Sequence, residues 1–219
     1  MREYLYHNVG NGKFEETGLL SGAAADNNGH TFAGMGVDFA DYNNDGLADL
    51  IITDLAHERY ALYDNNGDGT FAYSTLSSGI GAMTALHSGW GVRFLDYDND
   101  GWKDLLITHG HDLDTIELSY PDLHYREPML LARNTGHGFD DVSAASGDAL
   151  CQPWVGRGMA IGDSQQLSSA SDKRVHFGLG AEIEAQSIEI KWPIGIVQRI
   201  EHVRGNRILK INEAPPQAH

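Results

Sequence analysis

The sequence predicts an all-β fold made of repeated small sheets, followed by a smaller antiparallel β module. Three observations support this class: many glycines, an acidic loop that recurs between β-type runs, and a turn-containing segment that recurs between those loops. The chain has 26 glycines in 219 residues, and 41% of its residues are hydrophobic. Glycines at this frequency suit tight turns between short strands better than long helices.

The net charge bears on the kind of partner. The chain has 31 acidic against 15 basic residues, a formal charge of -16. A phosphate backbone would be repelled, so we expect no nucleic acid partner, whereas divalent cations would offset part of the self-repulsion.

No apolar run reaches the roughly 18 residues of a membrane-spanning helix. The charged start MREYLYHNVG is not a signal peptide, so we expect any export signal to lie outside this sequence.

The acidic loop occurs twice in the chain. The segment MGVDFADYNNDGLADLIITDL, from Met35, matches WGVRFLDYDNDGWKDLLITHG, from Trp90. Asp41 and Asp96 are therefore equivalent at a spacing of 55 residues. A third, weaker copy begins at RGMAIGDS, where Asp163 takes the equivalent position.

A second recurrent segment lies between the acidic loops. Its copies are LYHNVGNGKF from Leu5, LYDNNGDGTF from Leu62 and LARNTGHGF from Leu131. Apolar residues that alternate around an Asn-Gly or Asp-Gly centre predict a β-hairpin. Each unit then has about four strands and fits a propeller blade, which buries its free face on neighbouring blades. About three units are present, fewer than a closed propeller needs, so we expect a partial β-propeller.

The acidic loops have the pattern of calcium sites. With the first aspartate as position 1, oxygen-bearing side chains occupy positions 1, 3, 5 and 9, and glycine permits a sharp turn at position 6. Position 7 can add its backbone carbonyl, and a hard cation such as Ca²⁺ prefers such oxygens. The predicted ligands are Asp41, Asn43, Asp45, Leu47 and Asp49 in the first loop, and Asp96, Asp98, Asp100, Trp102 and Asp104 in the second.

Other interpretations of the loops fit less well. An EF-hand ends with Glu at position 12 between helices, but here position 12 is Ile52 or Ile107 and the flanks are β-type runs. A plain polar turn is an alternative for a single loop, whereas recurrence of the donors favours Ca²⁺ at two sites. The second loop carries one more carboxylate, so we expect tighter binding there. Mg²⁺ is less suitable because it demands stricter octahedral geometry.

These residues resemble the FG-GAP repeat, also described as the VCBS repeat, of integrin α-subunit propellers and many exported bacterial proteins. The resemblance covers roughly residues 5–163. Further on, HFGLG at 176–180 and WPIGIVQ at 192–198 resemble the C-terminal part of an ASPIC/UnbV domain. Together they resemble bacterial relatives of cartilage acidic protein, in which FG-GAP repeats precede an ASPIC/UnbV module.

The resemblance implies an organisation and a location. It assigns residues 1–163 to FG-GAP/VCBS blades, 164–213 to the C-terminal part of an ASPIC/UnbV-like β domain, and 214–219 to a loose tail. Members of that family continue after RGMAIGD through another loop and blade, so we expect a truncated chain with an internal deletion near 162–166. The residues themselves predict an antiparallel pair in the tail, since SIEIKW and VQRIEHV alternate around the turn PIG. The family implies an extracellular or periplasmic location.

We expect a non-enzymatic calcium-binding repeat protein that serves extracellular adhesion or protein interaction, with a protein or glycan as partner. Motifs of nucleophilic hydrolases, P-loop proteins and dinucleotide-binding proteins are not present in the sequence. One alternative is a polysaccharide-acting hydrolase or lyase built on the repeats, and another is a remnant that assembles through open blade edges. The segment THGHDLD offers either a metal site or a polar loop rim. Its candidate residues are His109, His111, Asp112 and Asp114.

Overall fold

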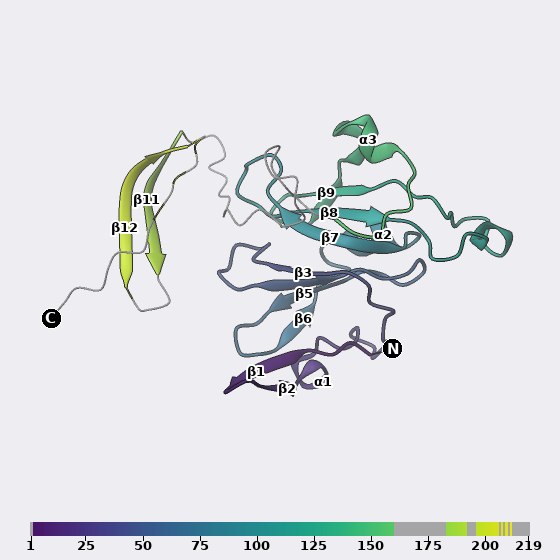
Figure 1. Cartoon of the computed structure of the whole chain (residues 1–219), viewed down its shortest axis with the longest axis horizontal. Coiled ribbons are helices and arrows are strands. Elements are labelled where there is room, and N and C mark those ends of the chain that lie inside the picture. The colour runs from purple at the N-terminus through teal and green to yellow at the C-terminus, as the bar shows by residue number, and fades with distance from the viewer. Residues whose placement is uncertain are drawn as a thin grey trace. The chain divides into compact units, whose positions relative to one another are not determined.

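A computed structural model describes residues 2–159, 183–191, 196–205, 207, 209 and 211. In this part of the chain the strands form four antiparallel sheets, two with four strands and two with two strands (Figure 1). The helices are short: α1 (Gly18–Ser21), α2 (Ile80–Thr84), α3 (Asp148–Cys151) and the 3-10 helices η1 (Ile116–Leu118) and η2 (Ser143–Ala145). The predicted all-β class is confirmed.

The first four-stranded sheet contains the first acidic loop. Its strands are β3 (Val37–Ala40), β4 (Asp49–Ile52), β5 (Ala61–Asn65) and β6 (Phe71–Tyr73), in that spatial order. The loop 41–48 joins β3 to β4, and the predicted hairpin is β5 and β6 with the turn 66–70. Each strand pairs antiparallel with the next, as in a propeller blade.

The second four-stranded sheet repeats this plan. Its strands are β7 (Gly89–Leu95), β8 (Asp104–His109), β9 (Leu130–Asn134) and β10 (Phe139–Asp141), again neighbours in chain order. The second acidic loop, 96–103, joins β7 to β8, and the predicted hairpin is β9 and β10. The 55-residue repeat in the sequence therefore corresponds to two blades of the same topology.

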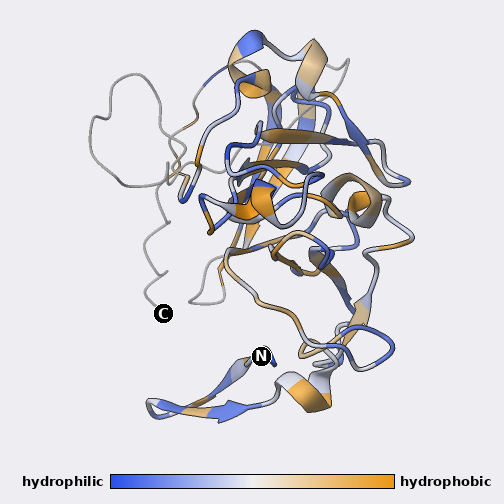
Figure 2. Ribbon diagram, turned by 90° about the vertical axis from the view of Figure 1, so that its right-hand side faces the viewer, coloured by the Kyte–Doolittle hydropathy of each residue, from blue (hydrophilic) through white to orange (hydrophobic). Residues whose placement is uncertain are grey.

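The remaining sheets are two hairpins. One pairs β1 (Tyr6–Gly10) with β2 (Lys13–Glu16), as its Asn-Gly turn predicts, and is largely hydrophilic (Figure 2). The other pairs β11 (Glu184–Lys191) with β12 (Val197–Arg204) and lies in a separate compact unit, so the antiparallel pair predicted in the tail is confirmed. Asp163 of the weaker third copy lies outside the described residues.

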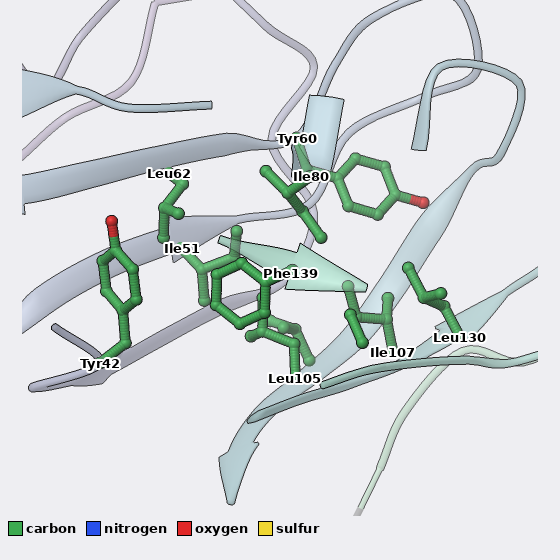
Figure 3. Close-up of a cluster of buried hydrophobic side chains, with 11 residues drawn as sticks. Tyr42, Ile51, Tyr60, Leu62, Ile80, Leu105, Ile107, Leu130 and Phe139 are labelled. Carbon is green, nitrogen blue, oxygen red and sulfur yellow. The ribbon is translucent and has the colours of Figure 1, made fainter. Parts of the chain in front are cut away.

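The main hydrophobic core lies between the two blades (Figure 3). Tyr42, from the first acidic loop, is part of it: its ring packs against Phe139 of the second blade at 5.6 Å between ring centroids, and its carbonyl accepts a hydrogen bond from Asn134 Nδ2 at 2.8 Å. The first loop is therefore anchored in the interface between blades. The buried core residues are Tyr42, Ile51, Tyr60, Leu62, Ile80, Val92, Leu105, Ile107, Leu130, Ala132 and Phe139.

The two middle strands of the first blade, β4 and β5, are buried on both faces. In β4, Ile51 belongs to the core between the blades, whereas Leu50 and Ile52 belong to a second cluster on the opposite face. In β5, Leu62 belongs to the core between the blades and Tyr63 belongs to the second cluster. Because successive side chains of a strand point to opposite faces, this continuous apolar run is what a strand between two packed layers requires.

Close backbone contact also joins the blades. A Cβ built on Gly36, just before β3, would lie 1.7 Å from the carbonyl oxygen of Trp90 in β7, so only glycine fits there. Beside it, the carboxylate of Asp38 accepts hydrogen bonds from the Arg93 guanidinium at 2.8 Å and from the backbone N–H of Phe94 at 2.9 Å.

Candidate metal centres

Both acidic loops join the first and second strands of a blade, so the predicted strand-loop-strand setting is confirmed. Their backbones turn in the same way. Position 4 is left-handed in both loops, with φ of 60° at Asn44 and 59° at Asn99. Position 6 is left-handed as well, at Gly46 and Gly101. Asparagine and glycine are the residues that tolerate this conformation, so the sequence specifies this turn twice.

The side chains of the first loop point towards its own backbone. The Asp41 carboxylate accepts hydrogen bonds from the N–H groups of Asp45 at 3.0 Å and Gly46 at 2.9 Å. Asn43 Oδ1 accepts from the N–H of Asp45, and Asp45 Oδ1 accepts from the N–H of Leu47. Each oxygen keeps a further lone pair, so these bonds suit a plain polar turn and also suit a loop that closes around a cation.

Position 9 distinguishes these loops from exposed polar turns. Asp49 is fully buried, and its two oxygens accept hydrogen bonds from the N–H groups of Tyr42 at 3.1 Å and Asn65 at 2.9 Å. Asp104 is also fully buried, and it accepts from Tyr97 at 3.0 Å and Asn134 at 2.8 Å. Each carboxylate thus connects its own loop to the following hairpin.

Burial of this carboxylate has an electrostatic cost. Desolvation, together with the nearby charges of Asp45 and Asp64, raises the pKa of Asp49 to about 6, against the lowering effect of the hydrogen bonds from Asn65 and Tyr42. A cation held beside this carboxylate would favour its ionised form.

In the second loop three carboxylates converge. Asp96, Asp98 and Asp104 each have one oxygen within 4.8 Å of the oxygens of the other two. They hold positions 1, 3 and 9 of the predicted ligand set, and Asp100, at position 5, is not part of this group. Three carboxylate oxygens at such separations fit a divalent cation that prefers oxygen ligands. In the first loop an amide, Asn43, replaces the carboxylate at position 3.

The side chain at position 7 packs against the hairpin turn that follows the loop. A Cβ on Gly67, in the turn between β5 and β6, would lie 3.1 Å from Leu47 Cδ1, and one on Gly136, between β9 and β10, would lie 2.8 Å from the Trp102 ring. Each position-7 side chain therefore covers the hairpin turn of its own blade. The backbone carbonyl of this residue stays a predicted ligand.

Two family models match the chain. The model described as FG-GAP-like repeat matches residues 2–52 and 41–107, which include both acidic loops, and the model described as ASPIC and UnbV matches residues 159–218. The chain carries FG-GAP-like repeats and an ASPIC and UnbV domain. The FG-GAP match covers the first four-stranded sheet and strands β7 and β8 of the second, and the two sheets share one topology. A comparison with curated proteins finds no match. In the described part of the chain, no helix is long and apolar enough to span a membrane.

One structural residue of the FG-GAP blades escaped the sequence interpretation. The asparagine of the hairpin motif, Asn65 or Asn134, donates from Nδ2 to a carbonyl of the acidic loop, that of Ala48 or Lys103. Its Oδ1 accepts from the N–H of the turn glycine. The sequence carries a signal for this role, because all three copies of the hairpin motif contain this asparagine, although an Asn-Gly motif by itself predicts only a turn.

The fold separates the candidate residues of the alternative site at THGHDLD, because His109 and His111 have different partners. His109 is buried at the end of β8, where its Nδ1 lies 2.9 Å from the carbonyl oxygen of Pro128. His111 Nδ1 lies 2.9 Å from Asp112 Oδ1, and Asp112 and Asp114 are exposed. His109 is grouped instead with His87 and Glu127.

Proposed function

We propose that this FG-GAP protein is a non-enzymatic calcium-binding protein of the extracellular or periplasmic space, whose blades serve adhesion or protein interaction. The observation that carries the calcium assignment is the convergence of Asp96, Asp98 and Asp104 in a loop whose backbone is repeated in the first blade. The ion is Ca²⁺ at two sites. It binds Asp41, Asn43, Asp45, Asp49 and the Leu47 carbonyl in one, and Asp96, Asp98, Asp100, Asp104 and the Trp102 carbonyl in the other.

Calcium binding on this scaffold is linked to blade stability. Asp49 and Asp104 are buried and hold backbone N–H groups of two segments each. A cation that offsets the charge of these carboxylates therefore stabilises the folded blade over the unfolded chain, in which the site does not exist. Carboxylates committed to Ca²⁺ are also poor proton donors, which favours a structural role over general acid catalysis.

The interaction role is supported by the domain content. Proteins with FG-GAP repeats are typically extracellular or periplasmic. An acidic chain with calcium-ordered loops suits an extracellular protein or a glycan as partner and disfavours nucleic acid.

Calorimetric titration of the demetallised full chain with Ca²⁺ tests the calcium assignment. We expect two binding events and a higher unfolding temperature in Ca²⁺ than in EDTA. The double variant Asp96→Asn, Asp98→Asn loses the tighter event, whereas Asp140→Asn, an exposed carboxylate on β10, keeps both. An absence of heat together with equal unfolding temperatures would contradict the proposal.

A glycan array and immobilised matrix proteins, each probed in Ca²⁺ and in EDTA, test the interaction role. We expect retention that depends on Ca²⁺ without release of reducing ends. Release of saccharide products by the wild-type chain would favour the hydrolase or lyase alternative instead.

A further inference from the structure

A second cluster of metal-binding side chains lies in the second blade, away from its acidic loop. It consists of His87, which precedes β7, His109, the last residue of β8, and Glu127, which precedes β9. One ligand atom of each lies within 4.8 Å of those of the other two. Because the acidic loop enters β8 at Asp104 and His109 ends that strand, the cluster and the predicted calcium site lie at opposite ends of β8.

The cluster is largely withdrawn from solvent. Glu127 is 3% exposed and His109 is 2% exposed, while the His87 side chain is 33% exposed. Glu127 Oε2 lies 2.6 Å from His87 Nδ1, and its Oε1 accepts a hydrogen bond from the N–H of Ser88 at 3.3 Å. The carboxylate and the two imidazoles thus form a largely buried cluster, in which His87 is the most exposed member.

The hydrogen bonding of His109 leaves a ligand atom available. Its Nδ1 faces the Pro128 carbonyl, which can only accept, so Nδ1 carries the proton and Nε2 carries a lone pair. Nε2 is buried and has no hydrogen-bond partner among the described residues. Metal-bound histidines commonly donate their second N–H to a carbonyl in this way. Burial, together with the neighbouring His87, also lowers the pKa of His109 to about 3, so the ring is neutral.

The first blade shows which part of the cluster the fold itself needs. The equivalent residues there are Phe32, Asp54 and Glu58. Glu58 accepts a hydrogen bond from the N–H of Ala33, just as Glu127 accepts one from the N–H of Ser88, so this glutamate has a structural role in both blades. The two imidazoles have no counterpart in the first blade, and the topology forms without them.

We propose that His87, His109 and Glu127 bind a divalent transition-metal ion of the Zn²⁺ class, with the remaining coordination position left to water or to an external ligand. Two imidazole nitrogens and one carboxylate suit Zn²⁺, whereas Ca²⁺ prefers oxygen ligands alone. This site is independent of the two calcium loops.

Binding requires one local rearrangement. The rings of His87 and His109 are stacked with an interplanar angle of 4° and 4.8 Å between centroids. An ion cannot lie in both ring planes while they are parallel and separated, so one ring turns. His87 is the more exposed ring, and it exchanges its hydrogen bond to Glu127 for the metal.

The test uses the full chain, stripped with EDTA and kept in excess Ca²⁺ so that the acidic loops are occupied. Titration with Zn²⁺ against a chromophoric chelator is expected to give one tight equivalent. Co²⁺ in its place is expected to give the visible absorption of a four-coordinate site. His109→Ala is expected to weaken Zn²⁺ binding by more than about 100-fold, since loss of a ligand exceeds the effect of loss of an outer-shell partner.

Matched variants separate this site from unspecific binding. His87→Ala alters the more exposed ring, so it remains informative if His109→Ala does not fold, and the same loss of Zn²⁺ is expected. His111→Ala removes the neighbouring histidine, and Glu58→Gln alters the equivalent glutamate of the first blade; both are expected to keep the tight equivalent. Retention of tight Zn²⁺ by folded His87→Ala, its loss in His111→Ala, or no tight equivalent in the wild type would overturn the proposal.

Discussion

The buried carboxylate of Asp104 accepts a hydrogen bond from the backbone N–H of Asn134 at 2.8 Å, which joins the end of the second acidic loop to the hairpin that follows it. Asp49 and Asn65 form the same bond in the first blade at 2.9 Å. The last residue of each predicted calcium loop is thus also part of the blade. Its structural role and its role towards the ion can be separated by mutation.

Asp104→Ala is expected to destabilise the protein even in EDTA. The substitution leaves the buried N–H of Asn134 without its acceptor, at a cost of about 1–3 kcal/mol. Asp98→Asn, at the exposed position 3, is expected to unfold like wild type in EDTA but to lose the stabilisation by Ca²⁺. Urea unfolding in both buffers measures the two effects, and equal behaviour of the variants would contradict this division of roles.

Asn43→Asp is expected to strengthen Ca²⁺ binding at the first loop, by roughly tenfold, because it supplies the carboxylate that the second loop has at position 3. The matched control is Asn44→Asp, which adds the same charge at position 4, a left-handed position outside the predicted ligand set. Calorimetry of the two variants distinguishes coordination from a general increase in negative charge. A similar gain in both would show that only charge matters.

Gly36→Ala is expected to destabilise the contact between the blades by about 1–3 kcal/mol or more, since overpacking forces the backbone to shift. The new Cβ would meet the carbonyl of Trp90 at 1.7 Å, a backbone atom that cannot move aside alone. Gly158→Ala is the control, because a Cβ there has no heavy atom within 4 Å. Thermal unfolding should show a lower midpoint for the first variant only.

Stability is expected to fall as the pH rises towards neutral, in part because of Asp54. Burial, together with the nearby charges of Glu58 and Glu3, raises the pKa of this carboxyl to about 7, against hydrogen bonds from the Gly34 and Ala33 N–H groups that lower it. The unfolded chain has a pKa of about 3.9, so the folded state binds more protons between these values. The free energy of unfolding therefore decreases across that window, by at most about 4 kcal/mol from this group.

Asp54→Asn removes this titration and should flatten the decrease. Urea unfolding in EDTA from acidic to neutral pH measures it, with Asp140→Asn as an exposed carboxylate control. An unchanged pH profile in Asp54→Asn would show that Asp54 is not the group responsible.

The sequence predicted the repeat, the hairpins and the strand-loop-strand setting because each has a local signal. Asn-Gly turns, the left-handed glycines at Gly46 and Gly101, and the spacing from Asp41 to Asp96 are all readable along the chain. Contacts between segments that are distant in the sequence could not be predicted from it. Nothing near Glu127 in the sequence indicates that it meets His87, because the pair forms only when β7 and β9 are placed on either side of β8.

The clustering of His109 with His87 and Glu127 also could not be predicted from the residues next to it in the sequence. Its nearest ionisable neighbour along the chain is His111, and the motif THGHDLD therefore suggested that pair. Strand alternation alone would place residues 109 and 111 on the same face, but β8 ends at His109 and the backbone turns at Gly110, where φ is 152°, so the two side chains have different partners. The repeats do differ at these positions, since His87 and His109 of the second repeat replace Phe32 and Asp54 of the first.

The two buried faces of β4 affect how this strand finds its alignment. A shift of one residue normally moves apolar side chains into solvent, and this penalty selects the correct pairing. In β4 the run from Leu50 to Ile52 would stay buried after such a shift, so hydrophobicity alone discriminates poorly between alignments. Asp49 supplies the missing discrimination, because only one alignment lets its carboxylate reach the N–H groups of both Tyr42 and Asn65. The acidic loop therefore sets the register of β4 in the sheet, even before any ion is bound.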